Sequence, residues 1–338
     1  MTFLDFLNLV GGLALFIYGM NMMSENLQAV AGNEMRRILK KITNTPFKGV
    51  LVGVAITGVI QSSSATTVML IGLVNAGIMT LQQAVGVVMG ANIGTTVTAQ
   101  LIAFNIGDVA LAFVIVGVVG TFLKRSRRME HWSLIILGFG LLFVGLNLMS
   151  ASVAVLKDSS FARQILARAA DYPLLAILAG ALFTMIIQSS SASVGIVMVL
   201  ATNGLISFEG AMYLVYGDNI GTTITAWLAG LGANNTAKRV ALVHTLFNII
   251  GTVVIATLTY QGIYKVFINA ITPGNVYLGE NMGRHIANAH TFFNVLNTLW
   301  MLPFAGLLAK LAERMIPKDP EDLVSLGEPK HLNYHLIH

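Results

Sequence analysis

The chain has 338 residues, of which 55% are hydrophobic and only 10% are charged, with a formal net charge of +5 and no cysteine. Soluble domains carry roughly 25% charged residues, so this composition predicts an integral membrane protein in contact with a lipid bilayer. The absence of cysteine excludes disulfides, thiolate metal sites and cysteine nucleophiles. The basic residues lie in short segments between apolar runs, where they report orientation in the bilayer and not binding to nucleic acid.

The sequence repeats itself along its length. Gln61–Ser64 recurs as Gln188–Ser191, and Asn92–Thr96 recurs as Asn219–Thr223, with the same offset in both cases. Upstream, a Gly-x-Asn-x-Met-Ser segment at 19–24 recurs at 145–150. Motifs held in one register across such a distance indicate a duplication. The chain therefore divides into membrane repeat 1 (1–126), membrane repeat 2 with a final spanning helix (127–310), and a polar cytoplasmic tail or linker (311–338).

Each Gln-Ser-Ser-Ser motif lies between two apolar arms that are too short to span a bilayer, since spanning takes roughly 20 helical residues. The arms are Gly49–Ile60, Ala65–Ala76, Leu174–Ile187 and Ala192–Thr202. We predict that each motif is the tip of a re-entrant helical hairpin, buried in protein and shielded from lipid. The alternative is one continuous span of about 28 residues that carries a patch of serines.

Further segments are predicted to span the membrane and complete an all-α fold. They are 3–27, 81–104, 107–123, 131–153, 208–231, 238–260 and 286–309. Fifteen Lys and Arg residues, among them Lys48 and Lys238, then fall on one side, and five, among them Lys265 and Arg284, on the other. The positive-inside rule predicts a cell inner (plasma) membrane protein with its amino terminus outside and its carboxyl terminus in the cytoplasm. An odd number of spans separates the repeats, so they are inverted, as in many secondary transporters with a midplane site.

The segment from Gly49 to Gly107 contains only neutral polar groups, because no Asp, Glu, Lys, Arg or His occurs in it. Buried hydroxyls and amides need partners, and hydrogen bonding between packed helices is one interpretation. Because the motif occurs twice, each time at a predicted helix break, we favour a binding site. Helix N-termini favour an anion, while hydroxyl and free carbonyl oxygens suit sodium, which would supply the missing counter-charge.

Asp218 breaks the symmetry of the repeats, because Ala91 stands at the matching position. An aspartate at membrane depth indicates a functional site, here a sodium ligand; the alternative is a cap at a helix break near the surface. Two further pairs, His244 with Asn248 and His290 with Asn294, each share one helix face. Too few ligands accompany them for a metal site, so we expect packing and hydrogen bonding.

These motifs resemble the type II sodium–phosphate cotransporter family in its bacterial branch, over roughly residues 1–310. The resemblance rests on the duplicated Gln-Ser-Ser-Ser, on Gly-x-Asn-Ile-Gly-Thr after each copy, and on the His-x-x-Phe-Asn helix. It implies a transporter and not an enzyme, which carries inorganic phosphate with more than one sodium and needs no other cofactor. Longer bacterial members carry a helical cytoplasmic domain similar to a phosphate-signalling regulator, so such a domain could follow the tail.

The resemblance also implies roles for individual residues around one cavity. Substrate binding falls to Gln61, Ser62, Ser63, Ser64, Gln188, Ser189, Ser190, Ser191, Asn92 and Asn219. Sodium binding falls to Thr66, Thr95, Thr96, Ser193, Thr222 and Thr223. Asp218 is not part of the family motif, and it joins these sodium ligands because of its position at membrane depth.

Other functions remain open at this stage. Donor-only recognition suits other oxyanions, such as arsenate or sulfate, and the same protein could export phosphate. An intramembrane enzyme using a serine with His244 or His290 would need a positioned base and an orienting third group. A passive anion pore would need rings of basic residues, which are absent. The sequence leaves the oligomeric state open, a homo-oligomer included.

Overall fold

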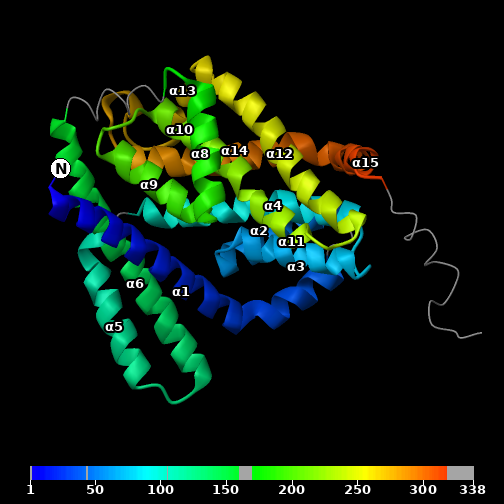
Figure 1. The fold of residues 1–338 in the computed structure, drawn as a ribbon, viewed down its shortest axis with the longest axis horizontal. Helices are drawn as coiled ribbons and strands as arrows, with labels where there is room; N and C mark the ends of the chain where they lie inside the picture. The colour runs from blue at the N-terminus through cyan, green and yellow to red at the C-terminus, as the bar shows by residue number, and fades with distance from the viewer. Residues whose placement is uncertain (1, 43–44, 105, 160–169, 318–338) are drawn as a thin grey trace, which may run out of the picture.

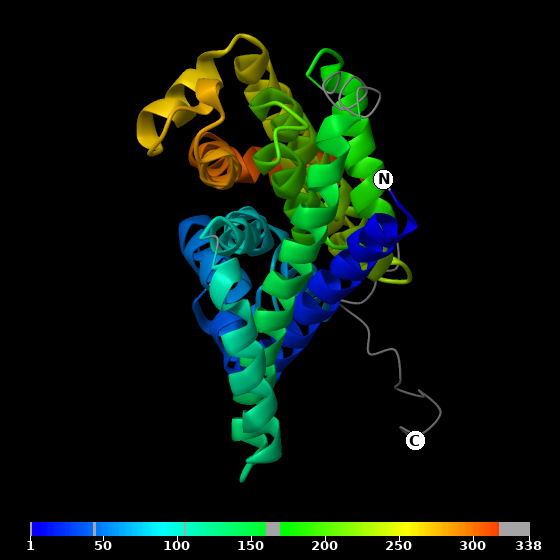
Figure 2. The same ribbon diagram turned by 90° about the vertical axis from the view of Figure 1, so that its left-hand side faces the viewer.

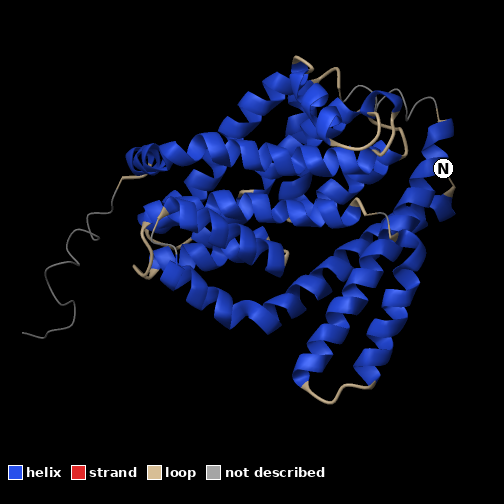
Figure 3. Cartoon of the chain, turned by 180° about the vertical axis from the view of Figure 1, so that it is seen from behind, coloured by secondary structure: helices blue, strands red, loops and turns tan. Residues whose placement is uncertain are grey.

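The computed structural model describes residues 2–42, 45–104, 106–159 and 170–317, and these residues form helices and connecting loops without a strand (Figures 1 and 3). The α-helices are α1 (Phe3–Ile42), α2 (Pro46–Ile60), α3 (Ser63–Asn75), α4 (Leu81–Ile102), α5 (Ala110–Phe122), α6 (Arg127–Ala154), α8 (Pro173–Ile187), α9 (Ser190–Thr202), α10 (Phe208–Thr222), α11 (Ile224–Gly230), α12 (Asn235–Tyr260), α13 (Ile263–Ile271), α14 (Met282–Met301) and α15 (Ala305–Met315). Short 3₁₀ turns are η1 (Gly107–Val109), η2 (Val155–Asp158), η3 (Val276–Leu278) and η4 (Leu302–Phe304).

The helix is broken at both Gln-Ser-Ser-Ser motifs, and the local chemistry of the break is the same. Gln61 ends α2 in the left-handed region, at φ 59°, and Gln188 ends α8 at φ 56°. The next serine, Ser62 or Ser189, is the N-cap of the following helix and accepts a hydrogen bond from the backbone of its third residue. A left-handed C-cap followed directly by a serine N-cap stops one helix and starts another. Neither motif therefore lies within a continuous helix.

The two broken pairs, α2 with α3 and α8 with α9, occupy equivalent positions in the fold. Each helix of the second pair begins and ends at the repeat equivalents of the residues that bound its counterpart in the first. Each first arm packs against the next long helix through glycine: a Cβ on Gly90 would lie 2.0 Å from Val50 O, and one on Gly217 would lie 1.9 Å from Ile177 O. Gly90 and Gly217 are themselves repeat equivalents, so the duplication extends to tertiary packing.

Two long helices, α1 and α6, pack closely through four glycines (Figure 2). Gly12 meets Gly145, and Gly19 meets Gly138; the Cβ that each glycine lacks would lie 2.8 Å or less from the carbonyl oxygen of its partner. In the sequence repeat, Gly12 corresponds to Gly138 and Gly19 to Gly145. Each glycine thus contacts the equivalent of the other glycine on its own helix. An antiparallel pair related by an approximate twofold axis has this pattern of contacts.

The close contact of Gly217 with α8 predicts that a single added methyl group at this position lowers the stability of the protein. Replacing Gly217 by alanine should lower the thermal unfolding midpoint in detergent, because overpacking of a close backbone contact costs about 1–3 kcal/mol or more. Gly72 of α3 is the matched control, since nothing lies within 4 Å of the Cβ it would gain. Gly72→Ala should leave the midpoint unchanged or raise it slightly. Equal midpoints for the two variants would contradict the packing described here.

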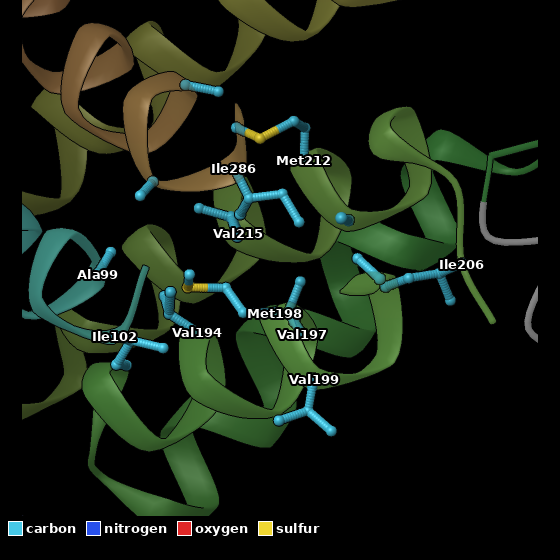
Figure 4. Close-up of a cluster of buried hydrophobic side chains, with 14 of the residues drawn as sticks. Ala99, Ile102, Val194, Val197, Met198, Val199, Ile206, Met212, Val215 and Ile286 are labelled. Carbon is cyan, nitrogen blue, oxygen red and sulfur yellow. The ribbon is translucent and has the colours of Figure 1, made fainter. Parts of the chain in front are cut away.

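The buried apolar residues form two cores. One gathers buried residues of α1, α6, α9, α10 and α14, and Figure 4 shows the part of it around Val194, Val197, Val215 and Ile286. The second gathers α2, α3, α4, α12 and α15, with Ile56 and Leu70 among its members. Each broken pair is therefore held by its own core.

Among the described residues, five helices or helix runs are long and apolar enough to cross a membrane. They are Phe3–Ala31, Leu81–Ile102, Arg127–Ala154, Asn235–Tyr260 and Met282–Met315. Two predicted spans differ from the expectation. The segment 107–123 is a 3₁₀ turn followed by the 13-residue α5, and 208–231 is divided at Thr223 into α10 and α11.

The ends of the predicted segments also differ. α1 continues to Ile42, so the basic segment expected as a loop after residue 27 is helical. The tail predicted from residue 311 begins inside α15, and residues 318–338 lie outside the described part of the chain.

Large apolar side chains cover the outside of several helices. On α8, Leu174, Leu178, Leu182 and Ile186 are 50–80% exposed and recur at every fourth residue, which places them on one face. α5 exposes Leu111, Ile115 and Phe122 in the same way. Contiguous apolar surface of this kind fits contact with lipid, as expected of a multi-pass membrane protein.

Candidate functional site

Both Gln-Ser-Ser-Ser motifs line one cavity of about 100 Å³. Its walls are formed by Met20, Asn21, Ser24, Gln61, Ser62, Ser63, Ser64, Thr95, Gln188, Ser189, Ser190 and Ser191. Every wall residue except Met20 is polar, and none is charged. All eight motif residues that the sequence predicted as substrate-binding are thus brought together from segments far apart in the chain.

The cavity lies at the N-termini of two helices. Ser63 and Ser64 open α3, and Ser190 and Ser191 open α9, each pair directly after its serine N-cap. The first backbone N–H groups of a helix have no partner within the helix, and the N-terminus carries about half a positive elementary charge. Two such termini with added serine hydroxyls provide many hydrogen-bond donors, which suits an anion rich in acceptor oxygens.

Two hydrogen bonds link a motif serine of one repeat to a threonine of the other. Ser64 Oγ donates to Thr225 Oγ1 at 3.2 Å, and Ser191 Oγ donates to Thr98 Oγ1 at 3.4 Å. Thr98 and Thr225 are repeat equivalents, so each repeat donates to the matching threonine of the other. Thr98 Oγ1 also donates to Gln61 Oε1 at 3.0 Å. These contacts fix the tips of the two broken pairs relative to one another.

The two copies of the Asn-Ile-Gly-Thr-Thr motif contribute fewer residues to the cavity wall than the sequence predicted. Thr95 lies on the wall, whereas Asn92 and Asn219 do not. Asn92 Nδ2 donates to Val88 O at 2.9 Å, and Asn219 Oδ1 lies 3.1 Å from His290 Nε2. The other predicted threonines, Thr96, Thr222 and Thr223, each donate to a carbonyl of their own helix.

Asp218 is fully buried in the interior of α10, so its interpretation as a cap near the surface is wrong. Its Oδ1 accepts from Thr184 Oγ1 at 2.7 Å, and the side chain of Ser193 lies close to the carboxylate. Its Oδ2 has no partner within the described structure. Ser193 lies one turn beyond the Ser189 cap on α9. The carboxylate therefore lies close below the tip of the second broken pair.

The matching place in the first repeat contains no charge. Thr57 Oγ1 donates to Thr66 Oγ1 at 2.9 Å, and Ala91 stands where α10 has Asp218. Thr57 and Thr66 are the equivalents of Thr184 and Ser193. The two oxygen clusters thus share their positions and differ by one carboxylate.

His244 and His290 are buried, as expected for packing residues. In the described structure no hydrogen bond joins either histidine to a motif serine, so a serine–histidine nucleophile is not assembled. No group of three or more His, Cys, Asp or Glu side chains gathers in the described ranges. Any cation site in these ranges must use hydroxyl, amide and carbonyl oxygens, with Asp218 as the carboxylate that is fully buried.

Residues of α1 on the cavity wall were not predicted as site residues. Asn21 and Ser24 face the cavity, and Ser24 Oγ donates to Ile60 O at 2.9 Å, which ties α1 to the last turn of α2. Both belong to the segment 19–24 that recurs at 145–150. The recurrence was a usable signal, because a polar segment repeated within an apolar helix needs an explanation as much as the serine motifs do.

Comparison with known proteins agrees with these motifs. The sequence profile of the Na⁺/Pi-cotransporter family matches residues 15–151 and 156–279. "Uncharacterized protein YqeW" of Bacillus subtilis is 31% identical over 302 residues, covering 89% of this chain and 95% of that protein. "Putative inorganic phosphate export protein YjbB" of Escherichia coli K12 is 29% identical over 330 residues, covering 98% of this chain and 59% of that protein.

A further relative aligns with a smaller part of the chain. "Sodium-dependent phosphate transport protein 2B" of Homo sapiens is 32% identical over 103 residues, which is 30% of this chain and 15% of that protein. No solved structure matches the chain significantly.

Proposed function

Because the chain belongs to the Na⁺/Pi-cotransporter family, we propose that it is a secondary active transporter that carries inorganic phosphate together with sodium. The substrate site is the cavity between the two motif tips, near the midplane of the bilayer. The observation that carries this proposal is the convergence of both Gln-Ser-Ser-Ser motifs on that single cavity.

The chemistry of the cavity supports an oxyanion. A volume of about 100 Å³ exceeds the roughly 10–15 Å³ that a cavity needs to hold one water molecule, so a small ion fits. The two helix N-termini and the serine hydroxyls supply donors. No cationic side chain lines the wall, so sodium bound nearby would provide the counter-charge, and this makes coupling a physical necessity for tight phosphate binding.

We assign phosphate contacts to the serines and glutamines of both motifs, with Asn92 and Asn219 supporting the helices behind them. The sodium ligands are assigned one turn below the tips. In repeat 2 they are Asp218 and Ser193, together with Thr184, and in repeat 1 they are Thr66 and Thr57. Thr95, Thr96, Thr222 and Thr223 complete these shells. The unpartnered Oδ2 of buried Asp218 supports this assignment.

We further infer that the repeats, 1–126 and 127–310, have inverted topology and that each broken pair is a re-entrant hairpin. The exchanged glycine contacts of α1 and α6 support an approximate twofold relation. The reciprocal links from Ser64 to Thr225 and from Ser191 to Thr98 support it at the site. We also propose that the protein lies in the cell inner membrane with its amino terminus outside and its carboxyl terminus in the cytoplasm, and the distribution of basic residues supports this orientation.

Phosphate export is the second candidate function. One observation favours it: a relative aligned with 98% of this chain is named as a phosphate export protein. The same site would serve both directions, and the ion gradients would decide which one operates. Other oxyanions, such as arsenate and sulfate, also fit a site that offers only donors.

Titration calorimetry on the purified protein tests the substrate and the coupling ion together. Phosphate should bind in sodium chloride and bind at least tenfold more weakly in potassium chloride, and arsenate should compete better than sulfate because it has the charge and protonation of phosphate. Equal phosphate affinity in the two salts would contradict the counter-charge argument. Tighter binding of sulfate than of phosphate would contradict the choice of substrate.

A further inference from the structure

The histidine–asparagine pairs of α12 and α14 belong to longer polar stripes. On α12, His244, Asn248 and Thr252 follow one another at intervals of four residues, and on α14 His290, Asn294 and Thr298 do the same. Residues four apart lie on one face of a helix. All six side chains are at most 4% exposed. Two buried polar stripes of identical composition therefore run through a region that is otherwise apolar.

The two asparagines of these stripes each leave an amide oxygen free as a hydrogen-bond acceptor. Asn248 Nδ2 donates to His244 O, and Asn294 Nδ2 donates to His290 O, both within their own helix. This geometry leaves each Oδ1 without a partner in the described structure. Buried polar atoms are nearly always satisfied, so two unpartnered amide oxygens at equivalent positions call for a ligand or a water.

The hydroxyls of Thr252 and Thr298 do not make the hydrogen bond that other threonines of α12 and α14 make. Thr257 and Thr259 of α12 and Thr291 of α14 donate to the carbonyl oxygen four residues earlier, at 2.7–3.0 Å. This back-bonding is the usual solution for a threonine in an apolar helix. Thr252 Oγ1 and Thr298 Oγ1 make no hydrogen bond in the described structure. Their oxygens are therefore available to a partner outside the helix.

The free oxygens lie close to one helix crossing. α12 and α14 meet where the side chain of Asn297 lies against Gly251, and Asn297 Nδ2 donates to Phe247 O at 2.9 Å. The Oδ1 of Asn297 is also unpartnered. Asn248 and Thr252 flank Gly251 within one turn, and Asn294 and Thr298 flank Asn297 within one turn. One turn is about 5.4 Å, so the residues that carry these five unpartnered oxygens lie within about one turn of the crossing along their helices.

We propose that this crossing binds one sodium ion through Asn248, Thr252, Asn294, Asn297 and Thr298. A cluster of neutral oxygens without a free amide donor suits a hard cation and does not suit phosphate. The absence of a carboxylate among the five favours a monovalent ion over calcium or magnesium, which recruit carboxylates. The choice of sodium rests on the proposed function, in which sodium is the coupling ion. The site is separate from the one assigned to Asp218, and His290 joins them by contacting Asn219.

The test is a sodium titration of the thermal unfolding midpoint of the purified protein without phosphate, with choline keeping the ionic strength constant. A bound ion stabilises the folded state by an amount that grows with the logarithm of its concentration divided by its dissociation constant. The double variant Thr252→Val/Thr298→Val should need about tenfold more sodium for the same stabilisation, which corresponds to about 1.4 kcal/mol. Thr257→Val, which removes a back-bonded hydroxyl from the same helix, should titrate like the unmodified protein.

A second variant keeps the proposal falsifiable if the double variant does not fold. Asn294→Asp preserves the shape of the side chain and adds a negative charge, so it should reach the same stabilisation at about tenfold less sodium. Sodium titrations of both variants that match the unmodified protein would overturn the site and leave the crossing to water or packing. Loss of sodium stabilisation in Asp218→Asn alone would likewise overturn it while supporting the proposed function. A lack of any sodium effect in the unmodified protein would overturn both.

Discussion

Replacing Ser63 and Ser190 together by alanine should reduce phosphate transport by at least a hundredfold without unfolding the protein. Both hydroxyls face the shared cavity, one from each repeat. A hydrogen bond to a charged group contributes about 1.5–3 kcal/mol, so each single variant should lose about tenfold or more. Transport is measured as uptake of radioactive phosphate by proteoliposomes, and the fold is checked by thermal unfolding.

The position of these serines separates binding from folding. Ser62 and Ser189 are helix N-caps, whose replacement costs about 1 kcal/mol of stability as well as a cavity hydroxyl. Ser63 and Ser190 come one residue later and have no capping hydrogen bond to lose. Ser152→Ala is the matched control, because Ser152 is buried on α6, bonds to Leu148 O and lies off the cavity. Normal transport in the double variant would exclude the cavity as the phosphate site.

Asp218→Asn should raise the sodium concentration for half-maximal phosphate uptake by at least tenfold. The substitution keeps the size of the side chain and an oxygen that can accept from Thr184, but it removes the fully buried charge. A carboxylate with one unpartnered oxygen is the strongest ligand for a cation in the described interior. The maximal uptake rate at saturating sodium should change much less than the sodium dependence.

A control variant tests whether the change in sodium dependence is specific to Asp218. Asp108→Asn removes an exposed carboxylate from the turn before α5 and should leave the sodium dependence unchanged. If Asp218→Asn also leaves it unchanged, the carboxylate does not bind the coupling ion and the asymmetry of the repeats has another cause. A variant that loses maximal rate alone would indicate a role in helix movement and not in sodium affinity.

Features that depend on local sequence were predictable. The repeat register follows from identity between segments, and the structure preserves it in the bounds of α2 and α8. The breaks at Gln61 and Gln188 follow from short apolar arms, and serine after the break is a preferred N-cap. The convergence of both motifs on one cavity was expected from the resemblance, and the geometry brings the eight motif residues together.

Features that depend on tertiary contacts were not predictable. Thr98 and Thr225 are single threonines in apolar helices, and only the fold places each beside a serine of the other repeat. The division of 208–231 at Thr223 could not be predicted, because no proline or glycine stands at the break. The equivalent helix of the first repeat, α4, is continuous. The stripes on α12 and α14 were visible as spacing, but their unpartnered oxygens depend on side-chain rotamers that no sequence pattern specifies.

In the proposed function, sodium entry drives phosphate through the cavity. Each sodium entering down about 100 mV releases roughly 2.3 kcal/mol, enough on its own for about fifty-fold accumulation of a neutral cargo. The most direct measurement is phosphate uptake into proteoliposomes with an inward sodium gradient, compared with an equal potassium gradient. We predict accumulation above the external concentration with sodium and none with potassium. Equal uptake in both salts, or no accumulation above equilibrium with sodium, would contradict the account.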